Sequence, residues 1–276
     1  MWMVNSSMRW KMTKRKIRFL LLAILLSAVF VVSGIQIYGE LAARQKEKNE
    51  FEELAALVEA SQPDSMPWPD MEPEDGEEAM PEPEATEPAG AEEALRDLSA
   101  LFARNGDCIG WLSIPDTAVD YPVMHTPENP QKYLRRSFYG EYSVSGVPFL
   151  DSRCSLGGDN LIIYGHNMKN GSMFAGLRGY TDSDFRAEHG QVELQTADGL
   201  TVYEVFAVVK TNNVDPWYAF TTAENEEAYG EAVRAMLAQA AYTSGTVPEY
   251  DQQLLTLSTC YGSSKSGRLL VIAAAP

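Results

Sequence analysis

An unbroken apolar run near the N-terminus constrains this chain more than any other feature of its sequence. From Phe19 to Tyr38 the residues are almost all apolar, with only serine, glycine and glutamine as mild interruptions. A helix of about 20 residues, rising about 1.5 Å per residue, spans about 30 Å, which is the thickness of a bilayer's hydrocarbon core. Residues 19–38 are therefore predicted to form a single transmembrane anchor.

The flanks of this run predict its orientation. Residues 9–18 carry lysines and arginines and no acid, and basic segments beside a membrane helix stay in the cytoplasm. We expect residues 1–18 to be a cytoplasmic tail and the rest of the chain to lie outside the cell. A cleaved signal peptide is the alternative, with a weak cleavage motif at Leu41-Ala42-Ala43, but the apolar run is longer than a usual signal core.

Two segments separate the anchor from the rest of the chain. Residues 39–60 have a helical composition with a loose apolar stripe, which predicts a short juxtamembrane helix without a function of its own. Residues 61–93 hold prolines and acidic residues and no lysine or arginine, which predicts a disordered, self-repelling spacer. The formal net charge is -17, and the absence of a basic patch beyond the N-terminus excludes a nucleic-acid partner.

The folded domain is predicted to cover residues 94–276. After a short helix near Ala94–Phe102, apolar segments alternate with turn signals, which is typical of β-strands. The expected strands are 109–114, 119–123, 147–150, 161–164, 191–196, 201–209, 254–258 and 269–273. Helices are expected at 172–177, 183–188 and 223–241. This order favours a mostly β fold, an eight-stranded closed or nearly closed barrel with inserted helices.

Three reactive side chains come at the ends of such strands. Cys260 ends one apolar segment, His166 follows another, and Arg268 returns eight residues after the cysteine. A thiol beside a guanidinium favours the thiolate, and an imidazole can exchange protons with it and with a leaving amine. The pattern indicates cysteine-based acyl transfer.

The remaining cysteines and histidines carry weaker signals. With three cysteines in all, at least one thiol is free, and sequence spacing alone leaves a Cys108–Cys154 bridge open. His125 lies in a turn, and His189 lies at a helix C-terminus where an imidazolium is favourable. Neither pattern has metal-ligand spacing, so no metal is expected.

These motifs resemble the sortase family of Gram-positive transpeptidases, most closely class B. The resemblance rests on Leu257-Ser258-Thr259-Cys260 with Arg268, on Tyr164-Gly165-His166-Asn167-Met168, and on segments such as Val147-Pro148-Phe149-Leu150-Asp151. It implies a sortase-type barrel in which Cys260 attacks the threonine carbonyl of a C-terminal sorting signal. His166 would protonate the leaving amine, and Arg268 would hold the carbonyl oxygen. No cofactor is implied.

The resemblance also implies partners and substrate contacts. The partners would be secreted proteins with a C-terminal sorting signal, and the acceptor amine would come from a peptidoglycan precursor or from a pilin. The substrate-binding residues would be Ser258, Thr259, Asn167, Tyr261, Asn129, Leu134, Trp217 and Tyr218.

The chain departs from the class B pattern in three places, one of which is His125, where the family commonly has glutamine. Tyr261 and a serine-rich loop replace the acidic residues expected after the cysteine, and one extra residue stands between Asn129 and Leu134. Two other functions compete with transpeptidation. Papain-like and NlpC-type peptidases place the cysteine before the histidine and on a helix, unlike this chain, and a non-catalytic binding module need not retain all three reactive residues.

Overall fold

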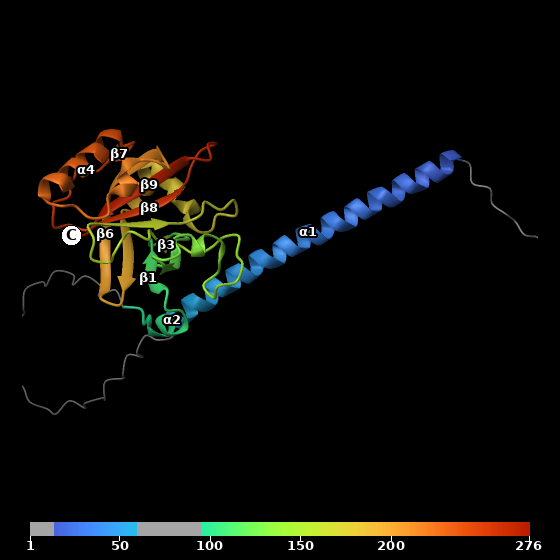
Figure 1. Cartoon of the computed structure of the whole chain (residues 1–276), viewed down its shortest axis with the longest axis horizontal. Coiled ribbons are helices and arrows are strands. Elements are labelled where there is room, and N and C mark those ends of the chain that lie inside the picture. The colour runs from blue at the N-terminus through green and yellow to red at the C-terminus, as the bar shows by residue number, and fades with distance from the viewer. Residues whose placement is uncertain (1–13, 60–94) are drawn as a thin grey trace, which may run out of the picture. The chain divides into compact units, whose positions relative to one another are not determined.

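The computed structural model describes residues 14–59 and 95–276, whose helices and strands are labelled in Figure 1. The predicted spacer at 61–93 and most of the predicted cytoplasmic tail therefore lie outside the described residues. The chain divides into two compact units, one ending at Asn49 and one covering Glu50–Pro276. Each unit is described by itself.

The first unit consists of the N-terminal part of helix α1 (Lys14–Glu59). Its apolar side chains are exposed throughout the predicted anchor, from Phe19 to Tyr38. Among the described residues, this is the one helix that is long and apolar enough to cross a membrane, by length and composition.

The second unit contains all the strands found in the described residues. They are β1 (Cys108–Ser113), β2 (Asp120–Met124), β3 (Phe149–Leu150), β4 (Asn160–Tyr164), β5 (Gln191–Thr196), β6 (Gly199–Asn212), β7 (Tyr242–Thr243), β8 (Leu254–Cys260) and β9 (Gly267–Ala274). The helices are α2 (Ser99–Arg104), η1 (Lys132–Arg135), η2 (Phe174–Thr181), α3 (Ser183–Glu188), η3 (Pro216–Ala219) and α4 (Glu226–Gln239).

The sheet closes into a barrel of eight strands. Its order is β5-β1-β2-β3-β4-β8-β9-β6, and β5 pairs with β6 again to complete the ring. The long strand β6 makes this closure possible because its first half pairs with β5 and its second half with β9, with a register shift between Val205 and Ala207. The predicted eight-stranded barrel is confirmed, and the short β7 is an addition that pairs only with β6.

Apolar runs produce the central strands. All residues of β8 before Cys260 are buried, as are Leu269 to Ala274 of β9. The sequence of a strand that is buried on both faces is a nearly continuous run of apolar residues, without the alternation of apolar and polar residues that marks a half-exposed strand. Where β1 approaches β5, Gly110 is required, since a Cβ there would lie 2.3 Å from the Gln195 carbonyl oxygen.

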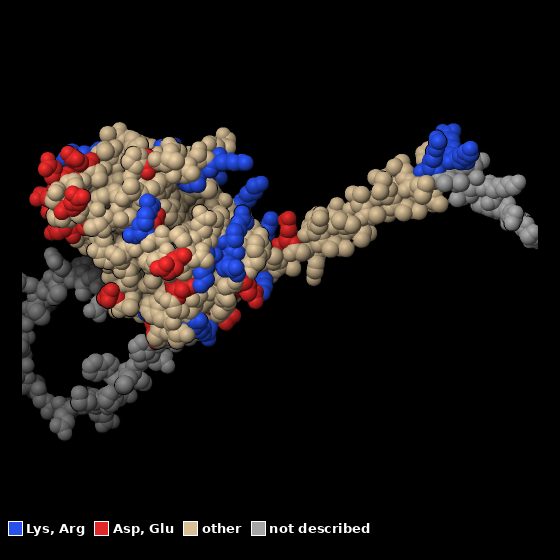
Figure 2. Space-filling model, in the orientation of Figure 1, with Lys and Arg blue, Asp and Glu red and all other residues tan. Residues whose placement is uncertain are grey.

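Helix α4 begins later than the apolar pattern predicts. The Asn225 side chain accepts a hydrogen bond from the Ala228 amide, which makes Asn225 the N-cap, and Glu226 and Glu227 occupy the first turn. Figure 2 shows acidic side chains gathered over this region of the domain. The helix therefore covers Glu226–Gln239 rather than the predicted 223–241.

The C-terminal end of α1 belongs to the second unit. Leu54 and Val58 are fully buried, and the Phe51 ring packs edge-on against Tyr121 at 5.1 Å. The Glu50 carboxylate also accepts a hydrogen bond from the Phe138 amide at 2.9 Å. Residues 50–59 are thus part of the domain's core, although the sequence pattern suggested only a juxtamembrane helix before a domain starting near Ala94.

Replacing Leu54 with alanine should lower the free energy of unfolding by about 2–5 kcal/mol, because it removes a fully buried side chain and leaves a cavity. The measurement is urea unfolding of the full chain in detergent, followed by tryptophan fluorescence. The control is Leu95→Ala, since Leu95 is 57% exposed. Equal stability of the two variants would show that residues 50–59 do not pack into the core.

Candidate active site

Strand register places a cysteine opposite an arginine. Cys260 is the last residue of β8, and its antiparallel partner on β9 is Arg268. Residues directly opposite each other in an antiparallel pair present their side chains on the same face. The thiol is exposed and the arginine is half-buried, so both can meet a ligand that arrives from solvent.

A second ladder brings a histidine to the same end of the sheet. Strands β4 and β8 are parallel with Tyr164 opposite Ser258, and the Gly165 amide donates to the Ser258 carbonyl at 3.1 Å. His166 follows directly, at the end where β8 reaches Cys260. Parallel pairing without a register shift therefore carries the imidazole toward the thiol.

All three side chains line one cavity. Its volume is about 660 Å³, and its wall includes His166, Cys260 and Arg268. Of the predicted substrate contacts, the same wall contains Leu134, Tyr218, Ser258 and Thr259. The structure therefore brings together the three reactive residues and half of the predicted binding residues.

The imidazole is held by a backbone carbonyl. His166 Nε2 lies 2.9 Å from the Leu134 carbonyl oxygen. Because a carbonyl only accepts, Nε2 carries the proton and Nδ1 is the basic nitrogen of the neutral ring. Burial lowers the pKa of His166, the Leu134 carbonyl opposes this shift, and the charge of Arg135 adds to it.

The guanidinium is oriented by the turn that precedes it. Arg268 Nη1 donates to the carbonyls of Lys265 at 3.1 Å and Gly267 at 2.8 Å. The Tyr261 amide in turn donates to the Gly267 carbonyl at 3.0 Å. The serine-rich loop thus closes on itself and holds the guanidinium end of the arginine side chain.

Hydroxyl groups line the floor of the cavity. Ser258 Oγ and Tyr218 Oη are 2.8 Å apart, and Thr259 Oγ1 donates to the Gly165 carbonyl at 2.8 Å. Burial raises the pKa of Tyr218 and the Ser258 hydrogen bond opposes this; the charges of Arg268 and Cys260 also act on the phenol, in opposite directions. Tyr218 is therefore a neutral hydroxyl close to the reactive pair.

The other predicted contacts lie outside the cavity wall. Asn167 Nδ2 donates to the Cys260 carbonyl at 2.8 Å, and Trp217 Nε1 donates to Thr256 Oγ1 at 3.0 Å. The ring of Tyr261 lies under Lys210 at 5.5 Å, and the Asn129 carbonyl accepts from Thr126 Oγ1. In this structure these four residues support the framework around the site.

The cavity wall also contains an acid–arginine pair that the sequence did not predict. The buried Asp151 carboxylate binds the Arg153 guanidinium through two hydrogen bonds of 2.9 and 2.7 Å, and Tyr164 Oη donates to it at 2.8 Å. Burial raises the pKa of Asp151, but the Arg153 hydrogen bonds outweigh it and the pKa falls below its usual range. Asp151 appeared in the sequence only within a family motif, which gave no sign of its partners.

The two other cysteines are buried free thiols. Cys108 and Cys154 belong to separate core clusters and are not bridged. Burial raises the pKa of each thiol to about 11. In the part of the chain that the structure describes, no group of three or more His, Cys, Asp or Glu residues is arranged to hold a metal ion.

Comparison with known proteins agrees with this geometry. Residues 112–275 match the family model described as the Sortase domain. The chain is 39% identical to sortase B of Listeria monocytogenes over 170 residues, which are 60% of this chain and 66% of that relative, just under two thirds.

Solved structures of sortase B proteins are also similar to this chain. A structure of sortase B from Bacillus anthracis in complex with AAEK1 superposes with a TM-score of 0.67 and 25% identity, covering 85% of this chain and 98% of that one. A Staphylococcus aureus sortase B–substrate complex superposes with a TM-score of 0.60 and 28% identity, covering 65% of this chain and 84% of that one.

At neutral pH, iodoacetamide should modify Cys260 and leave Cys108 and Cys154 unmodified, because only Cys260 is exposed and the other two thiols are buried with raised pKa values. Peptide mass spectrometry of the folded chain measures the three sites, and the chain unfolded in urea serves as the control. Equal labelling of the three cysteines in the folded chain would contradict this assignment.

His166 should make stability depend on pH. Its folded pKa lies below the ordinary 6.5, so the unfolded chain binds a proton that the folded chain does not. The free energy of unfolding should therefore fall as pH drops from about 6.5 toward the folded pKa. His166→Gln should make this decline shallower in urea titrations, and identical slopes for the two proteins would contradict the lowered pKa.

Proposed function

Because the chain belongs to the sortase family, we propose that it is a membrane-anchored cysteine transpeptidase. It would cleave a C-terminal sorting signal after threonine and transfer the protein to an amine of the cell wall. The observation that carries this proposal is that three side chains line one cavity. His166 follows the end of β4, Cys260 ends β8, and Arg268 lies near the start of β9.

The first half of the reaction uses all three residues. The Cys260 thiolate attacks the threonine carbonyl carbon, and the carbonyl oxygen gains negative charge. The Arg268 guanidinium donates hydrogen bonds to that oxygen, which stabilises the tetrahedral intermediate. The carbon–nitrogen bond then breaks as the His166 imidazolium gives its proton to the leaving amine, which produces a thioester and a neutral imidazole.

The second half reverses these roles. An acceptor amine attacks the thioester carbon, His166 takes a proton from it, and the carbon–sulfur bond breaks to restore the cysteine. The thioester retains the energy of the original peptide bond, so the residues of this chain need no cofactor for the exchange. Water in place of the amine would give hydrolysis.

The cavity supplies a path for the signal peptide. We assign Ser258, Thr259, Tyr218 and Leu134 to contacts with the signal, since all four line the cavity with the reactive residues. The structural relative from Staphylococcus aureus is itself a sortase B–substrate complex, which supports a bound peptide at this site. Asn129, Asn167, Tyr261 and Trp217 do not line this cavity, so we propose only an indirect effect of these four residues on the signal.

The N-terminal helix would fix the enzyme in the cell membrane. The apolar helix at residues 19–38 and the basic residues before it support a cytoplasmic N-terminus and an extracellular domain. Secreted proteins carrying a sorting signal would meet the domain there, and a peptidoglycan precursor would supply the amine. A pilin amine is the alternative acceptor.

Cys260→Ala should abolish both the thioacyl adduct and the release of the signal's C-terminal fragment, because no other exposed thiol exists to replace it. The assay incubates the full chain with a library of threonine-containing signal peptides, with and without an amine acceptor, and detects adducts and products by mass spectrometry. Cys154→Ala is the matched control and should retain activity.

Comparison of the reactions with and without the amine acceptor distinguishes transfer from hydrolysis. A product that contains the added amine supports a transpeptidase, whereas the free acid alone would indicate a peptidase. Signal processing that persists in Cys260→Ala would overturn the proposed mechanism, and a wild-type chain that binds peptides without forming an adduct would indicate a non-catalytic binding module.

A further inference from the structure

The contact between His166 and Leu134 depends on the backbone of a short helix. The acceptor is the Leu134 carbonyl oxygen in η1, 2.9 Å from His166 Nε2. A backbone acceptor is unaffected by the side chain at its own position, so what matters is where η1 is held. The residues that hold η1 therefore act on the imidazole.

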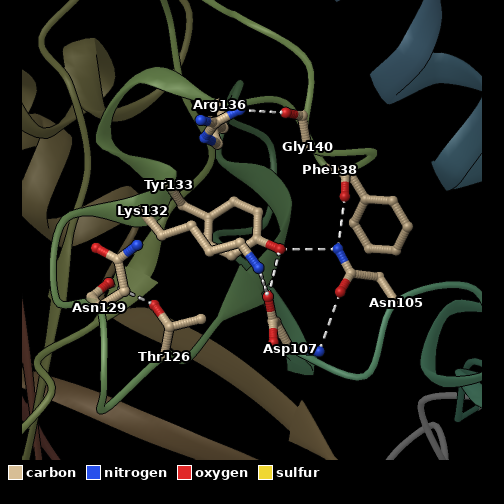
Figure 3. Close-up of polar contacts among 9 residues, drawn as sticks. All are labelled: Asn105, Asp107, Thr126, Asn129, Lys132, Tyr133, Arg136, Phe138 and Gly140. Carbon is tan, nitrogen blue, oxygen red and sulfur yellow. Dashed lines mark hydrogen bonds and ion pairs between the residues drawn. The ribbon is translucent and has the colours of Figure 1, made fainter.

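A buried tyrosine ties η1 to the start of β1. Tyr133 is 1% exposed, and its hydroxyl donates to Asp107 Oδ2 at 2.7 Å and accepts from Asn105 Nδ2 at 2.9 Å. The Lys132 ammonium pairs with the same carboxylate oxygen. Figure 3 shows these side chains converging on Asp107 from η1 and from the turn before β1.

Asp107 is itself held in place by hydrogen bonds of its backbone. The Asp107 carbonyl accepts from the His125 amide at 2.8 Å, and its amide donates to Asn105 Oδ1 at 3.0 Å. Burial alone would raise the pKa of Asp107, but the Lys132 and Tyr133 hydrogen bonds lower it overall. The carboxylate is therefore charged at neutral pH and accepts hydrogen bonds from two residues of η1, Lys132 and Tyr133.

A glycine packs against η1 from the other side. Gly146 has φ +61°, and a Cβ built there would lie 2.4 Å from the Tyr133 carbonyl oxygen and 2.8 Å from that of Leu134. The Val147 amide donates a hydrogen bond to the Tyr133 carbonyl at 3.1 Å, and His166 Nε2 donates to the Leu134 carbonyl. The Leu134 carbonyl thus sits in a narrow gap between the chain at Gly146 and the imidazole.

We propose that Tyr133 and Asp107 are positioning residues for His166: their hydrogen bond fixes η1 so that the Leu134 carbonyl holds the imidazole with its proton on Nε2. This inference rests on the proposed function for its catalytic meaning, since Nδ1 is then the nitrogen that exchanges protons. The hydrogen bond itself is a property of the resting protein.

The surroundings of His166 make this carbonyl important. Arg135 on η1 disfavours the imidazolium, as does burial. From the other elements, Cys260 and Arg268 line the same cavity, together with Asp215 and the Asp151–Arg153 pair. The hydrogen bond to the Leu134 carbonyl favours the charged imidazole. If η1 moves and this bond weakens, the pKa of His166 should fall further and the neutral ring should no longer be confined to the Nε2–H tautomer.

The test is Tyr133→Phe in the full chain in detergent, labelled with 15N-histidine. The chain has three histidines, so His→Gln variants assign each ring by NMR. The wild type should show the Nε2–H tautomer for His166 at high pH. Tyr133→Phe should show a mixture of tautomers and a lower midpoint of titration, with kcat lowered at least about tenfold and KM changed little.

The matched control is Tyr203→Phe, which removes a hydroxyl from another buried tyrosine, one that donates to Gln253 at 2.7 Å. It should leave the His166 tautomer, its titration and kcat as in the wild type. Asp107→Asn provides a second variant that keeps the side-chain volume and should shift the His166 signals in the same direction as Tyr133→Phe.

Wild-type His166 signals in folded Tyr133→Phe and Asp107→Asn would overturn the proposal, as would equal effects of Tyr133→Phe and Tyr203→Phe. The NMR signals are read without substrate. A chain that shows the predicted tautomer change but transfers no peptide would contradict the proposed function and leave this inference standing.

Discussion

The site depends on the register of three neighbouring strands. Parallel pairing of β4 with β8 sets Tyr164 opposite Ser258, and antiparallel pairing of β8 with β9 sets Cys260 opposite Arg268. A slip of one residue in either ladder would turn the side chains of a whole strand to the other face. Because β8 and β9 are buried along almost their whole length, such a slip would also place Arg268 where an apolar residue now packs. Core packing and the geometry of the candidate site are therefore enforced by the same hydrogen-bond ladders.

The histidine is the exception, since its ladder ends at Tyr164 and its ring is oriented from outside the sheet. The Leu134 carbonyl supplies that orientation, and the Asp107–Tyr133 network ties η1 to the first strand of the barrel. Burial and the carbonyl act on the imidazole in opposite directions, and burial outweighs the carbonyl, so the pKa of His166 lies below its ordinary value. In the proposed mechanism the imidazole gives a proton to the leaving amine and takes one from the acceptor amine, and a strongly favoured charge state on either side would slow one of these two transfers.

Long-range architecture was readable from the sequence because it follows apolar patterning. The buried runs at β4, β8 and β9 mark strands, and their ends mark the reactive residues. Features that rest on single polar contacts were not readable: the Asn225 cap moved the start of α4, and a carboxylate such as Asp107 has no sequence signal for its partner on η1. The core role of Leu54 was hidden because its apolar stripe resembles that of any amphipathic helix.

A crystal structure of the chain with a threonine-containing signal mimic bound covalently to Cys260 would show directly whether the three reactive residues act on one bound substrate. We expect the acyl oxygen to lie within hydrogen-bonding distance of the Arg268 guanidinium, with His166 on the opposite side of the sulfur. An acyl oxygen turned away from Arg268, with the peptide leaving the cavity by another route, would contradict this expectation.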